Sequence, residues 1–282
     1  MPTLPQLVSR NGRMILPAEA HISIFNPVIF GAFGVYESIQ LFRGAIFLLD
    51  DHLERLAESA AAIDLELPVN LETIAAWTHE AIAANGCQDA LIRLFALGPT
   101  VHAGAEVFIW PESPRTLAPE MFAQGVGAVS YHGERALPHA KSLNTLVNHL
   151  ARVRALQAGE HEGLLVNRHD CLTEGSSSNL FVVQAGTLVT PPVEDVLAGV
   201  TQEEVLKLAT RLAIPVERRP LPLSELGRWD EAFLTSTSRH VLPLVRLDGH
   251  LIGAGRSGPI TKDILAAFEA HFDAIIRSVH PS

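Results

Sequence analysis

Two residues of the chain have a sequence context in which a side chain can do chemistry, Lys141 and Glu174. Lys141 lies in ALPHAKSLNTL, between a proline-containing turn and the start of an amphipathic segment. Glu174 lies in DCLTEGSSSNLF, where one carboxylate is followed by a glycine, three serines and an apolar run. A lone lysine near a helix start is usually a solvated surface residue, and the serines also fit a polar hairpin at a sheet edge. Taken alone, each residue can therefore also be explained by a structural role without any chemistry.

A third segment, LAGVTQEEVLKLA, predicts a helix from about Thr201 to Leu212 that is preceded by Gly199. Free backbone amides and a hydroxyl at such a helix start form an anion-binding site. The same spacing fits Thr201 as a simple N-cap with Glu204 completing a capping box. The strand end TSTSRH adds four hydroxyl groups, either as an ordinary turn or as further donors for the same anion.

Arg55, in HLERL, falls at helical offset from Leu53 and Leu56, so surface exposure or a salt bridge is its default interpretation. The interpretation of these residues changes when the segments are considered together. One lysine, one carboxylate after a turn, one arginine, a glycine-led helix start and a hydroxyl-rich strand end are the parts that hold pyridoxal phosphate. The set therefore predicts a pyridoxal-phosphate site.

Composition limits the class of protein. The net charge is −10, from 31 acidic and 21 basic residues without a basic cluster, which argues against nucleic acid and anionic membranes as partners. No apolar run approaches the roughly 20 residues of a membrane span, and MPTLPQLVSRNG has no signal-peptide core. Cys87 and Cys171 lack ligand or CxxC spacing, and the histidines form no HExxH pair. We expect free thiols, no metal site and a cytoplasmic protein.

The elements that must position these residues begin with strands and helices in the first third of the chain. A turn at residues 11–12 separates two short strands. Asp50 or Asp51 is the predicted cap of one helix, and Asn70 is the predicted cap of a second helix that ends near residues 85–86. The runs ALIRLFAL and AEVFIW then predict two strands.

The rest of the chain mixes strands and helices without strict βαβ alternation, which predicts an α+β (mixed α/β) fold. With 282 residues, 48% of them hydrophobic, the chain is long enough for two domains. A proline-rich segment at 114–121 is the predicted linker. It separates a small N-terminal α/β domain over 1–113 from a larger cofactor-binding domain over 122–282.

The sequence resembles the class IV, fold-type IV pyridoxal-phosphate aminotransferases. That family includes branched-chain aminotransferases, D-amino acid aminotransferases and aminodeoxychorismate lyase. Matching blocks occur in order through nearly the whole chain: GVYESIQLFRGAIFLLDDHLERLAESA, KSLNTL, LLVNRHDCLTEGSSSNLFVV, LAGVTQEEVLKLA, EAFLTSTSRHVLPLVRLDG and GPITKDI.

The resemblance implies that Lys141 is the Schiff-base lysine and the acid/base that moves the substrate proton, and that Glu174 pairs with the pyridine nitrogen. It also implies a homodimer and ping-pong transfer between an amino acid and a 2-oxo acid. The other residues implied in cofactor binding are Arg55, Leu197, Val200, Thr201, Ser236 and Thr237. Those implied in substrate binding are Tyr36, Arg93 and Ser238.

Next to Glu174, Gly175 is interpreted as room for the cofactor ring to approach the backbone. The individual roles of Ser176, Ser177 and Ser178 stay unassigned.

The substrate is less sharply indicated than the cofactor. Arg93, in LIRLF, is similar to the Tyr-Ile-Arg-Pro segment of branched-chain enzymes, although a strand-to-helix salt bridge is its structural alternative; Leu146 replaces their tyrosine. KSLNTL and TEGSSSN are similar to D-amino acid aminotransferases, but the family's Pro-Arg-Ala-His segment reads Pro-Thr-Val-His here, which keeps His102 and lacks the arginine. Transamination of branched-chain L-amino acids is ranked first, D-amino acid transamination second and lyase activity third. A pyridoxal-phosphate carrier without turnover is the non-enzyme alternative.

Overall fold

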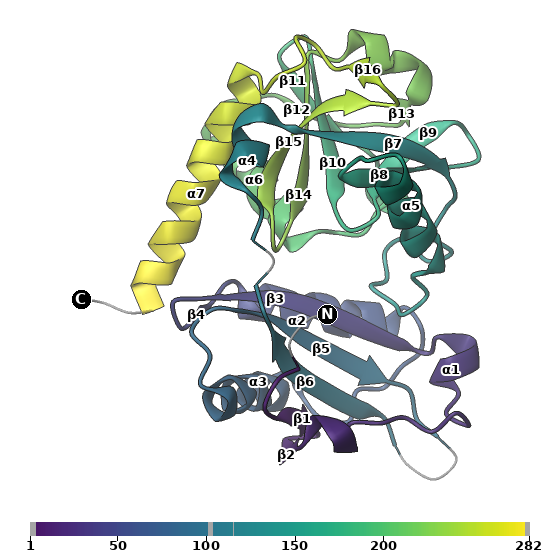
Figure 1. The fold of residues 1–282 in the computed structure, drawn as a ribbon, viewed down its shortest axis with the longest axis vertical. Coiled ribbons are helices and arrows are strands. Elements are labelled where there is room, and N and C mark those ends of the chain that lie inside the picture. Colours follow the sequence, from purple (N-terminus) through teal and green to yellow (C-terminus); the bar gives the residue numbers. More distant parts are fainter. Residues whose placement is uncertain (1–3, 101–103, 115, 280–282) are drawn as a thin grey trace. The chain divides into compact units, whose positions relative to one another are not determined.

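A computed structural model describes residues 4–100, 104–114 and 116–279, and packing divides them into two compact units (Figure 1). The first comprises the described residues of Met1–Arg115, Ala140–Asn144 and Ala274–Ser282, and the second comprises Thr116–His139 and Thr145–Asp273.

The predicted domains over 1–113 and 122–282 divide the chain at one linker, whereas the compact units interleave. Residues 140–144 belong with the first unit because Ser142 forms an isolated antiparallel bridge with Val35. This short segment contains Lys141.

Among its described residues, the first unit forms one six-stranded sheet in which neighbouring strands are antiparallel. Two long helices and two short ones accompany the sheet. The strands, in sheet order, are β2 (Arg13–Ile15), β1 (Val8–Arg10), β6 (Glu106–Glu112), β5 (Ala90–Leu97), β3 (Gly34–Phe42) and β4 (Ala45–Ile46). The helices are η1 (Pro17–Glu19), α1 (Val28–Gly31), α2 (Leu49–Ala61) and α3 (Leu71–Asn85).

Helix starts in this unit test the predicted caps. Asn70 is the N-cap of α3, and its side chain accepts a hydrogen bond of 3.0 Å from the backbone amide of Thr73, so this prediction is confirmed. The predicted cap of α2 is wrong. The helix already begins at Leu49, because Leu48 turns the chain with φ of +52°, and Asp50 and Asp51 lie in the first turn. Their negative charges still favour that helix end.

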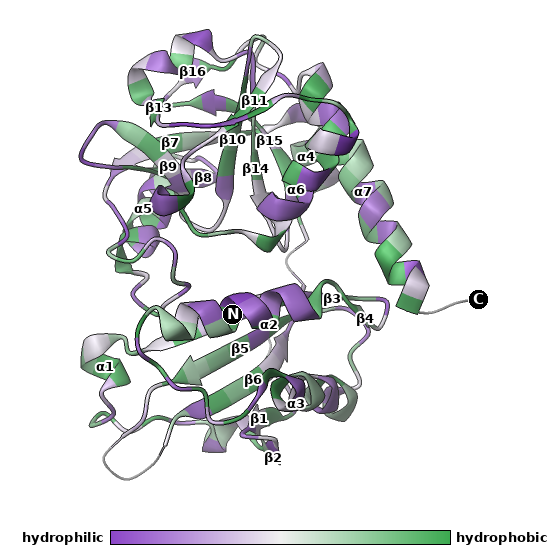
Figure 2. Cartoon of the chain, turned by 180° about the vertical axis from the view of Figure 1, so that it is seen from behind, coloured by the Kyte–Doolittle hydropathy of each residue, from purple (hydrophilic) through white to green (hydrophobic). Residues whose placement is uncertain are grey.

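The two faces of the first sheet differ in chemistry, as strand alternation requires. One face carries aliphatic residues such as Val35, Ile39 and Ile92, which pack in one buried cluster with residues of α2 and α3. Figure 2 shows β5 and β6 mostly in the hydrophobic colour. The opposite face carries Tyr36 and Phe95, which are paired in register and only half-buried. The core therefore leaves the second face available for a site.

In the described part of the second unit, ten strands form one mixed sheet. Its main path, in sheet order, is β12 (Val216–Arg218), β11 (Thr187–Thr190), β10 (Asn179–Gln184), β14 (Glu231–Ser236), β15 (His240–Leu247), β7 (Val126–His132), β8 (Glu162–Val166), β9 (Cys171–Gly175) and β13 (Leu221–Pro222). The strand β16 (His250–Leu251) pairs with β15. An additional pairing of β9 with β10 closes the strands from β10 to β9 into a ring.

Helices complete the second unit. They are α4 (Pro119–Gln124), α5 (Leu146–Gln157), η2 (Val193–Asp195), α6 (Val200–Arg211), η3 (Leu223–Arg228) and α7 (Pro259–Val279), the last of which contributes its C-terminal residues to the first unit. The predicted mixture of helices with a sheet of parallel and antiparallel pairs is present, and the α+β class is confirmed.

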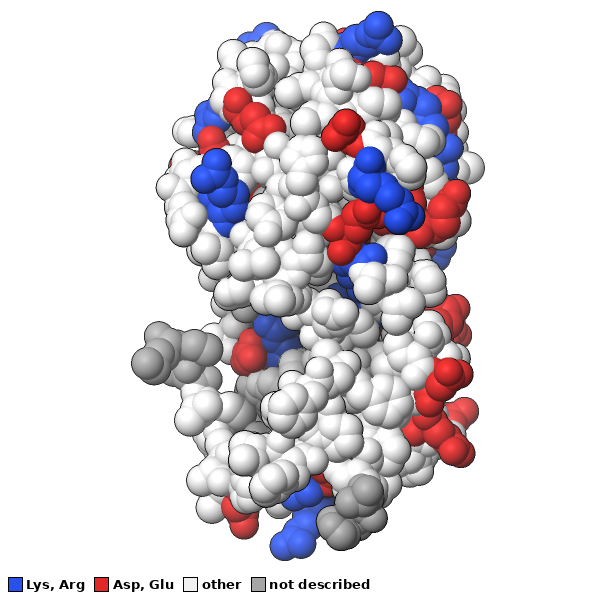
Figure 3. All heavy atoms as spheres, turned by 90° about the vertical axis from the view of Figure 1, so that its right-hand side faces the viewer, with Lys and Arg blue, Asp and Glu red and all other residues white. Residues whose placement is uncertain are grey.

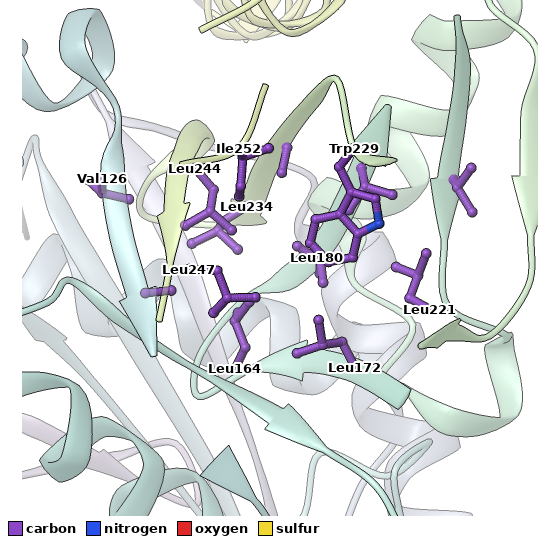
Figure 4. Packing of buried hydrophobic residues seen from close by; sticks show 14 of the residues in the cluster. Val126, Leu164, Leu172, Leu180, Leu221, Trp229, Leu234, Leu244, Leu247 and Ile252 are labelled. Carbon is purple, nitrogen blue, oxygen red and sulfur yellow. The ribbon is translucent and has the colours of Figure 1, made fainter. Parts of the chain in front are cut away.

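The ring of strands encloses the core of the second unit. Leu164, Leu172, Leu180, Leu234 and Leu244, from five different strands, are each at most 1% exposed and belong to one cluster (Figure 4). Close packing of this kind resists changes of even one methylene group. The strand ends that carry polar side chains are therefore held by a well-packed interior.

The surface carries both signs of charge. On the face drawn in Figure 3, the described lysine and arginine side chains lie scattered among acidic and uncharged ones. None of the described helices combines the length and the apolar character needed to cross a membrane.

Candidate active site

Lys141 lies in an extended segment of the first unit and not at a helix start, since α5 begins only at Leu146. Its backbone is held on both sides. Its amide donates to the Ser59 hydroxyl of α2 at 3.0 Å, and its carbonyl accepts from the Tyr36 amide of β3 at 3.0 Å. The amine Nζ lies 4.7 Å from the centre of the Tyr36 ring, within cation–π range. The structure therefore brings together Lys141 and Tyr36, two of the predicted site residues.

Gly34 explains how the segment comes so close to the strand. A Cβ atom at this position would lie 2.8 Å from the Ala96 carbonyl oxygen and 2.8 Å from a methyl carbon of Leu143. The Leu143 amide also donates to the Gly34 carbonyl at 2.9 Å. A side chain at Gly34 would push the lysine-bearing segment off β3.

Arg55 is buried, not exposed, and the salt-bridge interpretation is the one that the structure supports. Its Nε and Nη2 donate to the two carboxylate oxygens of Glu37 at 2.8 and 2.7 Å. The Nδ1 of His52 lies 2.8 Å from the same carboxylate, and the side chains of Glu37 and His52 are almost completely buried. Burial alone would raise the pKa of Glu37, but the Arg55 charge and the contacts with His52 hold it well below its usual range.

The pKa of His52 is lowered, first by burial and also by the positive charges of Arg55 and Lys141, against the opposing effect of Glu37. Because an ionised carboxylate can only accept, Nδ1 of the neutral ring carries the proton. Within the described structure, the buried Nε2 has no hydrogen-bond partner.

Arg93 lies on the same sheet face as Tyr36 and opposite Ser38, which is further along β3. Its Nε donates to Glu112 at 2.9 Å and its Nη1 to the Ser38 hydroxyl at 2.5 Å. The Arg93 charge is thus paired with a residue of the same sheet. Its structural alternative had predicted a salt bridge from the strand to a helix. The Phe95 ring lies 5.8 Å from Tyr36 and forms part of an aromatic row beside this pair.

Glu174 lies in strand β9 of the second unit. The predicted hairpin is present, and the Glu174 carboxylate is also held in a fixed direction by hydrogen bonds. Glu174 pairs with Asn179 of β10 across the serine turn. Its carboxylate accepts from Nη1 of Arg135 at 3.1 Å and from the backbone amide of Leu197 at 3.1 Å. The side chains of Glu174 and Arg135 are 6% and 8% exposed, so this hairpin is not a polar edge.

Asn179 ties the polar strand ends of the second unit together. Its backbone is in register with Glu174 on one side and with Thr235 on the other. Its side-chain amide donates to the Leu197 carbonyl at 2.8 Å. A Cβ atom at Gly199 would lie only 2.0 Å from the Asn179 side-chain oxygen. Asn179 therefore places the carboxylate strand, the approach to α6 and the hydroxyl-bearing end of β14 next to one another.

Helix α6 begins at Val200 with Gly199 as its N-cap, so the predicted capping box of Thr201 and Glu204 is wrong. The side chain of Gln202 instead accepts from the Gly199 amide at 3.4 Å. Glu204 is drawn away from the helix start by Lys207 at 2.6 Å and by His271 at 2.8 Å. The amides of Val200 and Thr201 lie in the first turn, where helix amides have no partner in their own helix.

The serine triplet forms the turn between β9 and β10, and Gly175 precedes it; the interpretation of Gly175 as room for a cofactor ring stays a prediction. A Cβ atom there would lie 2.1 Å from the Ser178 hydroxyl and 3.2 Å from the carboxyl carbon of Glu162. The glycine is needed for the turn to close on Glu162. Ser236, the last residue of β14, and Thr237 and Ser238, in the turn to β15, are half-buried.

Sequence reasoning missed four residues that hold these parts, and His102 lies outside the described residues. The missed residues are Glu162, Arg239, Arg135 and Glu112. A charged residue at the start of an apolar strand run is the one signal that pointed to Glu162, in HEGLLV. In the part of the chain that the structure describes, no group of three or more metal-ligating side chains is arranged to hold a metal ion.

Each unit by itself offers donors that fit one part of pyridoxal phosphate. The first unit offers a lysine amine beside an aromatic ring, and the second offers a buried carboxylate, a helix start and a hydroxyl-bearing turn. An amine suits an aldehyde, a carboxylate suits a pyridinium proton, and helix-start amides with hydroxyls suit a phosphate.

The α+β architecture is that of the fold-type IV aminotransferases. The chain belongs to the class IV aminotransferases: residues 34–247 match the family described as amino-transferase class IV. It is 32% identical to a D-alanine aminotransferase of Bacillus licheniformis, over 92% of this chain and 94% of that protein. It is 28% identical to a branched-chain-amino-acid aminotransferase of Pseudomonas aeruginosa, over 94% and 91%.

Solved structures agree. The branched-chain aminotransferase of Thermoproteus uzoniensis, solved with norvaline, has a TM-score of 0.88 at 30% identity, with 98% of each chain covered. The branched-chain amino acid aminotransferase of Thermobaculum terrenum, solved in its PLP-form, has a TM-score of 0.84 at 26% identity, covering 96% of this chain and 95% of that one. The predicted family and enzyme class are confirmed.

Proposed function

We propose that the protein uses pyridoxal phosphate to move an amino group between an amino acid and a 2-oxo acid in a ping-pong reaction. The observation that carries this proposal is the fixed placement of the Lys141 amine over Tyr36 in a chain of the class IV family. When bound, the cofactor supplies an aldehyde for covalent attachment and a ring that withdraws electrons. The similar enzyme of Thermobaculum terrenum was solved in its PLP-form.

The residues of this chain have separate roles in the proposal. The Lys141 amine attaches the cofactor and then takes the proton from the substrate Cα. The Glu174 carboxylate holds a proton on the pyridine nitrogen, while Arg135 and the Leu197 amide keep that carboxylate in place. The remaining proposed contacts are Leu197 on the ring face, the Val200 and Thr201 amides with Arg55, Ser236 and Thr237 on the phosphate, and Tyr36, Arg93 and Ser238 toward the substrate.

The proposed substrates are branched-chain L-amino acids. The aromatic row of Tyr36 and Phe95 offers apolar surface, and the Arg93 charge is already paired with Glu112. D-amino acid transamination is the second candidate, because TEGSSSN resembles the D-amino acid enzymes and the chain is 32% identical to a D-alanine aminotransferase.

The test follows the cofactor spectrum of purified protein while L-leucine, D-alanine and aminodeoxychorismate are added in turn. We expect L-leucine to convert the cofactor to its amine form and a 2-oxo acid to restore it. Pyruvate release from aminodeoxychorismate without an oxo acid would instead identify a lyase. A cofactor that binds and responds to no amino compound would identify a carrier.

Lys141→Ala is the matching variant, with Lys207→Ala, whose side chain is 58% exposed, as its control. Borohydride is expected to fix cofactor mass to the unmodified protein and to the control, but not to Lys141→Ala. Turnover in Lys141→Ala should fall by roughly 10⁴-fold or more, since it loses both attachment and proton transfer. Turnover near that of the unmodified protein would contradict the role of Lys141.

We also propose a cytoplasmic homodimer. Residues around α1 expose large apolar side chains, with Phe25 at 87% and Phe30 at 90% exposed, and such patches mark interaction surfaces. The two free cysteines are in keeping with a reducing compartment. Light scattering after gel filtration tests the dimer, and a monomer at all concentrations would contradict it.

A further inference from the structure

The serine triplet is held by one buried carboxylate of the second unit, Glu162, whose side chain is fully buried. Ser178 donates its hydroxyl to Glu162 at 3.0 Å, Ser176 also donates to it, and the Ser177 hydroxyl lies 3.4 Å away. Because a carboxylate only accepts, the hydroxyl protons of Ser176 and Ser178 are used inside the protein. These two serines are therefore not donors to a ligand.

Arg239 completes the group and points inward. Its Nη1 donates to Glu162 at 2.9 Å, and its Nη2 donates to the Ser177 carbonyl and hydroxyl at 2.7 and 2.8 Å. Its Nε donates to the Ser236 hydroxyl oxygen at 2.9 Å. Only 10% of the Arg239 side chain is exposed, so its charge is directed at the protein and not at a ligand.

The contact with Ser236 decides which way that hydroxyl points. A serine hydroxyl has one donor hydrogen and two acceptor lone pairs. Arg239 donates to one lone pair of the Ser236 oxygen, so the hydrogen of the Ser236 hydroxyl is directed away from the guanidinium. A hydroxyl polarised in this way is a better donor to an anion.

Burial would raise the pKa of Glu162, but the Arg239 charge and the hydrogen bonds from Ser176 and Ser178 lower it overall. The carboxylate therefore stays ionised and keeps the guanidinium fixed. The same turn carries Thr237, and the strand before it is in register with Asn179.

We propose that Glu162 and Arg239 are a positioning pair which aims the Ser236 hydroxyl as a hydrogen-bond donor at the phosphate of the cofactor. The inference rests on the proposed function, since it assumes that pyridoxal phosphate is the ligand. It assigns the serine triplet to the support of the phosphate site and not to direct contact with the cofactor.

The test compares the affinities of cofactor-free protein for pyridoxal phosphate and for pyridoxal, which has no phosphate. Binding is followed by absorbance in the unmodified protein, Arg239→Gln and Arg239→Lys. Arg246→Gln is the matched control, because Arg246 also forms a pair, with Glu160 at 3.0 Å, but has no bond to the Ser236 turn. Unfolding by urea is measured for all variants.

We expect Arg239→Gln to weaken pyridoxal phosphate about tenfold or more, as for the loss of one charged hydrogen bond, and to leave pyridoxal within about twofold. Arg239→Lys should show the same selective loss, because an ammonium group cannot reach Glu162, Ser177 and Ser236 in one plane. Arg246→Gln should bind both ligands normally.

Three results would overturn the inference. Equal weakening of both ligands would make the pair a general support of the fold, unchanged affinities would remove its role, and full rescue by lysine would show that charge alone matters. If Arg239→Gln does not fold, Ser177→Ala, which removes one acceptor of the arginine, is measured in its place with the same expected direction. Unmodified protein that binds neither ligand would refute the proposed function itself.

Discussion

Both compact units bury carboxylates against arginines, and two of these pairs, Glu37–Arg55 in the first unit and Glu162–Arg239 in the second, are built differently. In the first unit, two nitrogens of Arg55 donate to the two oxygens of Glu37, which joins α2 to β3. In the second, Arg239 gives one nitrogen to Glu162 and the others to Ser177 and to Ser236. In the first pair, here called closed, the arginine gives two nitrogens to a single carboxylate, whereas the arginine of the second, shared pair connects three separate segments.

This difference separates two uses of a buried ion pair. A pair that is closed on itself fixes the packing of one helix on one sheet, and its loss leaves a buried charge without its partner. A pair whose arginine is shared leaves other acceptors when one partner is removed. The first should therefore matter more for stability, and the second more for the orientation of the groups that it connects.

The largest expected effect is that of Glu37→Gln. This change leaves Arg55 without its buried counter-ion and should destabilise the first unit by about 3–5 kcal/mol. Hydrogen exchange followed by mass spectrometry is the measurement, since peptides of β3 and α2 report this unit separately. Faster exchange is expected there and not in β14 or β15. Glu58→Gln, on the exposed side of the same helix, is the control and should have no effect.

Part of the first pair could be read from the sequence. Arg55 was placed on a helix with a salt bridge as one interpretation, whereas its partners Glu37 and His52 were not identified. The family and the fold class were also accessible, because matching blocks and the mixture of strands and helices extend through nearly the whole chain. The cap at Asn70 was accessible because it depends on a short segment. The start of α2 was not, because it is set by the backbone of Leu48.

The second pair could not be predicted in the same way. Glu162 and Arg239 are 77 positions apart, and only the pairing of β10 with β9 and β14 brings the serine turn to the strand end near Arg239. Local spacing carries no information about such a closure. Glu174 was found through its family motif, but its partner Arg135, 39 positions away, had no motif.

Glu162→Gln should have a smaller effect than Glu37→Gln, about 1–3 kcal/mol. The amide can still accept from Ser178, and Arg239 keeps its acceptors in Ser177 and Ser236. Exchange in peptides of β8 and of the serine turn measures it, with the exposed Glu120→Gln as the control. A loss as large as that of Glu37→Gln would contradict the distinction between a closed pair and a shared one.

The smallest expected effect comes from two histidines, one beside each ion pair. It is the loss of stability at low pH that these histidines contribute. Burial lowers the pKa of His52, and burial together with Arg239 lowers that of His161. The folded chain keeps these rings neutral, whereas the unfolded chain takes up protons below about pH 6.5. The unfolded state then binds more protons, so the free energy of unfolding falls as the pH falls below that value.

Each histidine contributes at most about 1.4 kcal/mol per pH unit to this slope. We expect His52→Gln to flatten the loss of stability between pH 7 and pH 5, measured by urea unfolding, more than His161→Gln does, because His52 is fully buried and His161 only partly. The exposed His79→Gln is the control and should leave the slope unchanged. An equal flattening by His161→Gln would show that the two centres respond alike to acid, and that the closed pair of the first unit is no more sensitive than the shared pair of the second.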